Sequence, residues 1–238
     1  MKTSLSTLCA LLVILGVSLS AKGAPIAGNP NSGAYLMPAP DLSRWSGGVY
    51  VHARVRNVNV GGVHLPLYSK RTAGYLGFDV LSWLTVYGTL VDGSHKVGYG
   101  TTSGNNEYGG GVLLSLLNDE IFAPTVLEDV LRLNATIQYT EGDIFLFNKS
   151  VPFHEVYGAL TLHIINEIDG NKLYWPDAIG LFIGPVYSTV KADNLREEQS
   201  AGFNLGLEFF FTDRITMNFG TEQIDAQNKY LYGLHIRF

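Results

Sequence analysis

Three features are scarce in this chain, and each scarcity excludes a class of protein. Cysteine occurs once, as Cys9 in an N-terminal apolar stretch, so a chain that loses this stretch has no disulfide and no thiolate metal site. Basic residues number 16 against 21 acidic ones, and no basic patch favours nucleic acid. After the N-terminus, no apolar run reaches the length of about 18 residues that a membrane helix needs. Any membrane crossing must therefore be made by strands.

The N-terminus has the pattern of a secretory signal. Lys2 precedes an apolar core, Leu8 to Val17, that is too short to span a bilayer. Small residues up to Gly23 offer cleavage sites, so we expect a signal peptide over residues 1–23 and a mature chain from Ala24. An uncleaved anchor helix is the alternative.

Residues 24–44 have a different composition from the rest of the chain. Four prolines and two glycines fall within them, a mixture that favours extended, unpaired backbone. We interpret this segment as a periplasmic leader to the first strand. Entry into a barrel as a plug is the other interpretation.

Glycine and aromatic residues are abundant. The chain has 27 glycines, 13 tyrosines and 12 phenylalanines, which suits tilted strands with girdles of aromatic rings at the membrane surfaces. Aromatic residues toward predicted strand ends, which we expect to form these girdles, are Trp45, Trp83, Tyr87, Tyr174, Trp175, Tyr187, Phe209, Phe211, Tyr230, Tyr232 and Phe238.

Apolar and polar residues alternate with a period of two, which separates the two faces of a strand. Most of the segments reach the roughly 9 to 11 residues that a tilted strand needs to cross a bilayer. We predict ten strands, with eight or twelve as alternatives. The segments are Val49–Arg56, Arg71–Val80, Trp83–Asp92, Asn106–Leu117, Leu131–Thr140, Phe153–Glu167, Asp177–Val190, Gln199–Thr212, Arg214–Asp225 and Lys229–Phe238.

The connections between these segments alternate in length. Short turns are expected at Leu81–Ser82 and Asp213, on the side of the termini. Two connections on that side are longer, Asn118–Val130 and Ile168–Pro176, and a helical turn over Pro124–Leu131 fits the first of them. On the opposite side we expect longer polar or Gly-rich loops at Asn57–Lys70, Gly93–Asn105, Gly142–Pro152 and Lys191–Glu198.

The last strand ends the chain on an aromatic residue. Its apolar face carries Tyr230, Tyr232, Leu234, Ile236 and Phe238. This strand resembles the closing strand of bacterial outer-membrane β-barrels, in which a C-terminal aromatic residue is part of the assembly signal. A soluble secreted all-β protein is the alternative.

The resemblance to small outer-membrane barrels of the OmpA/OmpX kind covers residues 45–238, and we expect no peptidoglycan-binding domain after the barrel. It implies a closed antiparallel up-and-down transmembrane β-barrel in the bacterial outer membrane. Its partners would be outer-membrane lipid, lipopolysaccharide and the barrel-assembly machinery, which would recognise the C-terminal strand.

The non-lipid face of the predicted strands collects many charged side chains. In a narrow, partly dry lumen an unpaired charge is expensive, so we expect these groups to pair and fill the barrel. A constricted pore with a charged lining is the alternative. The predicted lumen residues are His52, Arg54, Arg56, Asp79, Glu107, Arg132, Glu155, His163, Glu208, Glu222, His235 and Arg237.

Catalytic and metal motifs are missing from the sequence. No histidine has a serine two residues away, and neither a Gly-x-Ser-x-Gly elbow nor a His-Glu-x-x-His zinc motif occurs. We therefore expect no enzyme, no cofactor and no metal site. The expected role is structural or one of interaction through the outer loops. A narrow charge-selective channel is the first alternative, and a lipid-active enzyme that brings a His, a carboxylate and a hydroxyl together from distant segments is the second.

Overall fold

The computed structural model describes residues 43–98, 103–122, 128–146, 149–167, 176–197, 200–212, 214–224 and 227–238. The predicted signal peptide and most of the leader, up to residue 42, lie outside this part, as do Tyr174, Trp175 and Asp213. Within it, no helix has the length and apolarity needed to cross a membrane.

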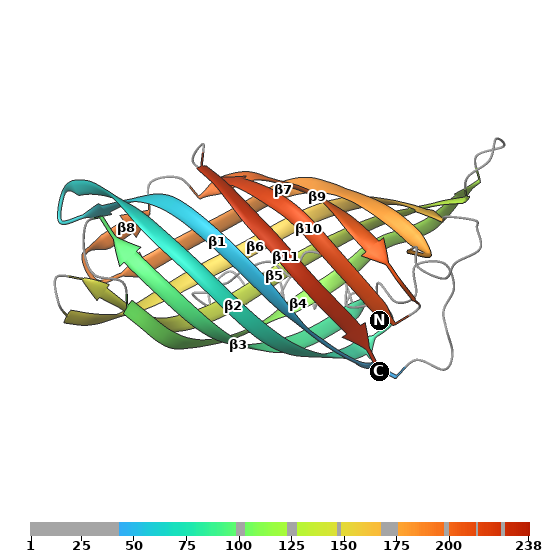
Figure 1. The fold of residues 1–238 in the computed structure, drawn as a ribbon, viewed down its shortest axis with the longest axis horizontal. Helices are drawn as coiled ribbons and strands as arrows, with labels where there is room; N and C mark the ends of the chain where they lie inside the picture. Colours follow the sequence, from blue (N-terminus) through green and yellow to red (C-terminus); the bar gives the residue numbers. More distant parts are fainter. Residues whose placement is uncertain are drawn as a thin grey trace, which may run out of the picture.

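The described strands form a single antiparallel sheet, and ten of them close into a barrel (Figure 1). The short strand β8 is additional to these ten. The strands are β1 (Trp45–Val60), β2 (Val63–Leu81), β3 (Leu84–Val97), β4 (Ser103–Phe122), β5 (Glu128–Leu146), β6 (Lys149–Glu167), β7 (Ala178–Ala192), β8 (Leu195–Glu197), β9 (Ala201–Phe210), β10 (Ile215–Ile224) and β11 (Gln227–Arg237).

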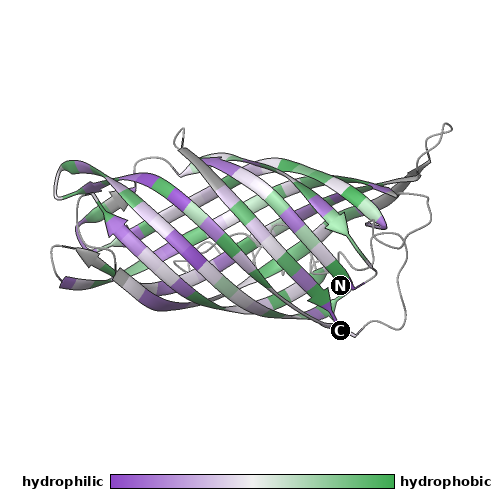
Figure 2. Ribbon diagram, in the orientation of Figure 1, coloured by the Kyte–Doolittle hydropathy of each residue, from purple (hydrophilic) through white to green (hydrophobic). Residues whose placement is uncertain are grey.

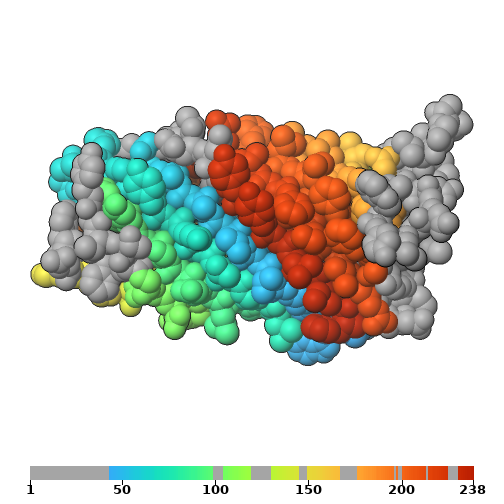
Figure 3. Space-filling model, viewed as in Figure 1, coloured from blue at the N-terminus to red at the C-terminus, as the bar shows by residue number. Residues whose placement is uncertain are grey.

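The barrel closes where the first strand meets the last. β1 pairs with β11 from Ser46 opposite Arg237 to Ala53 opposite Tyr230. Figure 3 shows the blue first strand and the red last strand in contact along this seam. The closed up-and-down architecture with ten strands is confirmed, and the counts of eight and twelve are wrong.

Most of the segments predicted to be outer loops are strands. β1 and β2 continue to a two-residue turn at Gly61 and Gly62, whose φ angles of 59° and 92° suit glycine. Much of the other three predicted loops, Gly93–Asn105, Gly142–Pro152 and Lys191–Glu198, likewise belongs to strands, namely β3, β5, β6 and β8. The alternation continues through these segments, and pairing satisfies their backbone groups. We call the end of the barrel that carries the Gly61–Gly62 turn the outer end.

The connections near the termini also differ from expectation. Residues 118–122 continue β4, and residues 128–131 belong to β5, so the predicted helical turn over Pro124–Leu131 is wrong there. Residues 123–127 lie outside the described part. The hairpin ladder between Asn118 and Arg132 accounts for the difference, because each strand supplies the backbone partners of the other.

The wall is not equally tall all round. β2, β5 and β6 have 19 residues each, whereas β9 and β10 have 10. β8 pairs with both β7 and β1, with Leu195 opposite Ala192 on one side and Val60 on the other. Asn194, with a φ of 61°, makes the turn that leads into it. β8 therefore joins β1 to β7 at the outer end, beyond the shorter C-terminal strands.

The two faces of the wall differ in chemistry. Large apolar side chains are exposed on the outside, for example Leu90 at 76% and Phe203 at 66%. Figure 2 shows hydrophobic and hydrophilic residues alternating along the strands. Tyr87 is an exception to the predicted girdles: it shares the inward parity of Thr85 and is buried, because Gly111 leaves room for its ring.

Candidate functional site

The candidate site is the barrel interior, which collects the predicted lumen residues. Eleven of the twelve side chains are buried, and Arg237 is part-buried near the end of the termini. The structure does not gather them in one place. They divide into an outer ionic layer and several smaller groups nearer the termini.

Glu155 on β6 is the centre of the outer ionic layer. Its carboxylate contacts the guanidinium groups of Arg54 and Arg56, and Nη1 of Arg71 lies 2.5 Å away. The Ser188 hydroxyl donates a hydrogen bond of 2.6 Å to the same carboxylate. Three cations around one anion leave positive charge that further carboxylates must balance.

Three more glutamates supply this balance. Glu107 lies 2.9 Å from Nε of Arg71, and Glu222 lies 3.5 Å from Arg54. Glu197, from β8, accepts two contacts of 2.6 Å from Nη1 of Arg56, and the Val190 backbone N–H donates to it at 2.8 Å. The ionic layer therefore holds three guanidinium groups against four carboxylates, with β8 tied into it.

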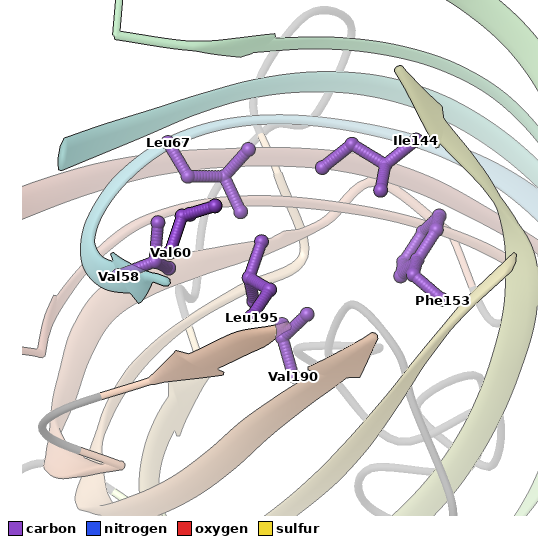
Figure 4. Packing of buried hydrophobic residues seen from close by; sticks show 7 residues of the cluster. All are labelled: Val58, Val60, Leu67, Ile144, Phe153, Val190 and Leu195. Carbon is purple, nitrogen blue, oxygen red and sulfur yellow. The ribbon is translucent and has the colours of Figure 1, made fainter. Parts of the chain in front are cut away.

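An apolar cap covers the outer side of this layer. On β1, Val58 and Val60 follow Arg54 and Arg56 toward the outer turn, and the other strands keep the same order. Figure 4 shows the cap side chains directed toward one another across the space that the strands enclose. Seven residues, each at most 4% exposed, form the cap: Val58, Val60, Leu67, Ile144, Phe153, Val190 and Leu195.

A layer of tyrosines lies on the other side. Tyr50, Tyr75 and Tyr87 are buried together with apolar neighbours. Gln138 accepts a hydrogen bond of 3.0 Å from Tyr87 and donates one of 3.4 Å to Tyr50. The charged layer is thus enclosed between an apolar cap and a hydrogen-bonded aromatic layer.

Smaller polar groups occupy the half of the lumen nearer the termini. Arg132 donates to Asn118 at 3.0 Å, and Nδ1 of His163 lies 2.9 Å from Glu208. The Tyr75 hydroxyl lies 2.8 Å from Nδ1 of His235. His52 is buried in the same interior and also has an interaction partner.

Asp79 and Arg237 form the group closest to the chain ends. Nη2 of Arg237 lies 2.6 Å from Asp79, and the Thr85 hydroxyl donates to the same carboxylate at 2.6 Å. The Arg237 side chain is 13% exposed and the Asp79 side chain 8% exposed. This pair is therefore separate from the outer ionic layer.

Ser69, His95 and Glu107 form a hydrogen-bonded chain at the edge of the ionic layer. The Ser69 Oγ lies 2.9 Å from Nδ1 of His95, and Nε2 of His95 lies 2.5 Å from Glu107. All three are buried. A hydroxyl, an imidazole and a carboxylate in this order are the residue types of an activated nucleophile, but Arg71 also engages this carboxylate.

The sequence prediction missed five members of the outer ionic layer and of the hydrogen-bonded chain at its edge. Arg71 shares the parity of Asp79 on one strand, a signal that was available. His95 and Glu197 fell in segments predicted to be loops. Ser69 lies directly opposite His95 on the neighbouring strand, so a search for serine two residues from histidine does not find it. Ser188 is one of several inward hydroxyls with no distinguishing pattern.

The outward face of β11 carries the predicted assembly residues. Tyr230, Tyr232, Ile236 and Phe238 are 55%, 49%, 38% and 53% exposed, and Leu234 is half-buried among them. The Phe238 backbone N–H donates to Trp45 at 3.1 Å. The terminal aromatic residue therefore lies beside the first residue of β1.

Within the described ranges, no group of three or more His, Cys, Asp or Glu side chains is arranged to hold a metal ion. The acidic groups of the outer layer contact arginines instead.

No protein-family model matches this chain, and no curated protein matches it in sequence. Among solved structures, it is similar to an outer membrane channel from Pseudomonas putida F1, with 11% identity, a TM-score of 0.45, and 91% of this chain and 100% of that chain covered. It is also similar to the transport unit of the autotransporter AIDA-I from Escherichia coli, with 12% identity, a TM-score of 0.43, and 89% and 99% covered. The translocator domain of the autotransporter NalP from Neisseria meningitidis gives 10% identity, a TM-score of 0.32, and 98% of both chains covered. Likenesses at these values say nothing of function.

Proposed function

We propose that this chain is a bacterial outer-membrane β-barrel with a sealed lumen, acting as a structural or surface-interaction protein. The apolar outward face supports the membrane location, because large apolar side chains, Leu90 and Phe203 among them, are exposed on most strands of the wall, which a soluble barrel would not present to water. The secretory pattern at the N-terminus supports export, with cleavage before Ala24.

The observation that carries this proposal is the apolar cap over the ionic layer. Val60, Ile144 and Leu195 come from three different strands and are all but completely buried. Ten strands enclose little space, since about eight are just filled by side chains. Charges beneath such a cap are held by one another and not by water, which favours a filled interior over a water-filled pore.

Single-channel recording tests the proposal. The barrel is refolded in detergent, its folding is verified by the difference in gel mobility between unboiled and boiled samples, and it is inserted into a planar bilayer. We expect a folded barrel without discrete openings. Regular, charge-selective openings from folded protein would overturn the sealed-lumen role.

A narrow channel is the second candidate, because Arg54, Arg56 and Arg71 surround Glu155 at one level of the lumen. Rings of charged side chains select ions in pores. If the barrel is a narrow channel, Arg54→Ala should change its conductance or ion selectivity. Arg132→Ala, in the other half of the lumen, should do the same. Unchanged currents in both variants would exclude the two residues from any conduction path.

A lipid-active enzyme is the third function to consider. Among the described residues, its only specific support is the chain of Ser69, His95 and Glu107. All three face the interior, and Arg71 occupies the carboxylate that would orient the imidazole. We therefore propose that the protein is not an enzyme.

The outward face of the last strand bears on assembly and on the partners of the barrel. We infer that Tyr230, Tyr232, Leu234, Ile236 and Phe238 form the strand that the barrel-assembly machinery recognises. Their apolar side chains lie on the face that the proposed function turns toward lipid, and outer-membrane lipid and lipopolysaccharide are the surroundings of that face. A truncation that removes Phe238 tests this by slowing assembly in cells while leaving refolding in detergent intact.

A further inference from the structure

A hollow lies on the outside of the wall where β11, β1, β2 and β3 run side by side. Its lining includes Tyr68, Lys70, Ser94, Lys96 and Tyr230. The strand registers place Lys70 opposite Ser94, and Lys96 opposite Tyr68. The two lysines are thus diagonal neighbours, and such Cα atoms are about 7–8 Å apart.

The side chains around the hollow point away from the lumen. Lys70 alternates with buried Ser69 and Arg71, and Lys96 follows buried His95. Tyr68 and Tyr230 are 47% and 55% exposed. The hollow is therefore open to whatever surrounds the barrel. Arg54 and Ser69 also line it, but both residues are buried and their side chains belong to the interior.

No carboxylate in the described part of the chain forms an ion pair with the lysines of the hollow. Within the described ranges, neither Lys70 nor Lys96 forms an ion pair or hydrogen bond through its side chain. The nearest outward acid by register is Asp92, which is a diagonal neighbour of Lys70 but makes no ion pair with either amine. Two free amines beside hydroxyl groups form a surface suited to an anion with several acceptor oxygens.

The position of the hollow limits which anion fits. Toward the termini, β2 and β3 first present Thr72 and Asp92 outward and then apolar residues such as Leu76 and Leu90. On β1 the outward residues are apolar from Ala53 to Val49, whereas Asn57 and Asn59 lie on the other side of the hollow. Tyrosine is typical of the level where apolar chains meet headgroups. The hollow lies at the outer edge of the apolar band.

We propose that this hollow binds the phosphate groups of lipopolysaccharide in the outer leaflet. Lys70 and Lys96 provide the cations, Ser94 and Tyr68 provide hydroxyl donors, and the Tyr230 ring borders the acyl chains. The inference rests on the outer-membrane location in the proposed function. A lipid phosphate fits better than a soluble one, because the apolar and aromatic outward residues of β1 and β11 continue from the hollow toward the termini.

Native mass spectrometry of the full-length barrel in detergent tests the site, with bisphosphorylated lipid A as the probe. In the double variant that combines Lys70→Gln and Lys96→Gln, we expect the apparent affinity for lipid A to fall about thirtyfold. This fall is equivalent to about 1 kcal/mol for each lysine. The matched control is Lys149→Gln with Lys191→Gln, which removes two exposed lysines outside the hollow and should leave the affinity within about twofold. Heat-modifiable gel mobility verifies that both variants fold.

Lipid A without phosphate and inorganic phosphate complete the test. We expect the dephosphorylated lipid to bind the unaltered barrel as weakly as lipid A binds the variant, and inorganic phosphate alone not to bind. Equal loss in the control pair, or no loss in the variant, would overturn the site. Tight binding of inorganic phosphate would replace the lipid with a soluble ligand.

These outcomes are separable from the test of the sealed lumen. If the barrel conducts ions, but replacement of Lys70 and Lys96 weakens lipid A binding, the proposed function is contradicted and the lipid site is supported. If the barrel is electrically silent, but the double lysine variant binds lipid A as tightly as the unaltered protein, the proposed function is supported and the lipid site is contradicted.

Discussion

Arg56 on β1 and Glu197 on β8 are 141 residues apart in the chain, yet Nη1 of Arg56 lies 2.6 Å from both carboxylate oxygens of Glu197. β8 is only three residues long, so its backbone ladder is short. The contact adds a side-chain tie that holds β8 over the ionic layer. The closure of the outer end thus depends in part on one ion pair.

Replacement of Glu197 by Gln should destabilise the barrel. The change leaves Arg56 buried with less negative charge nearby, and loss of one partner of a buried pair costs about 3–5 kcal/mol. We expect a value near the lower end, because Glu155 still contacts Arg56. The free energy of unfolding is measured by urea titration in detergent, with gel mobility of unboiled samples as the readout.

The control for this variant is Asp143→Asn, which neutralises an exposed carboxylate on β5. Exposed substitutions usually change the free energy of unfolding by about 0.5 kcal/mol or less. Equal effects of the two substitutions would mean that the Arg56–Glu197 contact does not stabilise the closed end.

The apolar cap should be sensitive to cavities. Leu195 is 2% exposed within the cap, so Leu195→Ala should lower the free energy of unfolding by about 2–5 kcal/mol. Leu205 on β9 provides a matched leucine that is 45% exposed on the outside, and Leu205→Ala should have a much smaller effect. The same urea titration compares them. A larger loss at Leu205 would show that the cap is loosely packed.

Asp79 and Arg237 offer a pair that can be exchanged. Each single change, Asp79→Arg or Arg237→Asp, places like charges together and should cost about 3 kcal/mol in the free energy of unfolding. The double exchange should recover most of this loss. It should remain about 1 kcal/mol below the original, because the hydrogen bond from Thr85 to Asp79 is not restored.

A double-mutant cycle measures this coupling. Additive losses in the double exchange would mean that the pair does not interact in solution. The same exchange at Arg56 and Glu197 is not equivalent, because it would place a new carboxylate against Glu155.

The sequence predicts the barrel because its determinants are local and repeated. Strict alternation in segments such as Leu131–Thr140 separates two faces, and one face carries the lumen charges. Strand number and closure then follow from the count of such segments. The outer strand ends were missed because Gly61 and Gly62 resemble a loop in composition, although Val58 and Val60 continue the alternation.

The ionic layer could be predicted only in part, because its last members depend on long-range pairing. β8 has three residues, too few for a period to be visible, and it pairs with two strands far away in the sequence. Glu197 therefore gave no sign of its inward position. The order of cap, ionic layer and tyrosine layer likewise requires the register of all strands at once.

Ser69 should not react as a nucleophile. Its hydroxyl hydrogen-bonds to His95, but its side chain is 7% exposed and faces an interior covered by the cap. Glu107 is shared with Arg71, which weakens its support of a positively charged imidazole. We expect a fluorophosphonate probe to leave the folded barrel unlabelled, as judged by intact mass.

Ser69→Ala is the matched control, since any label that persists in this variant lies elsewhere. The unfolded chain serves as a second control, because its serine lacks the imidazole partner. Label found on Ser69 in folded protein, and lost in His95→Gln, would establish an activated serine with access from outside. That result would make the lipid-active enzyme the leading function and would contradict the sealed lumen, because in the described barrel a reagent would have to pass the cap, the tyrosine layer or the wall to reach Ser69.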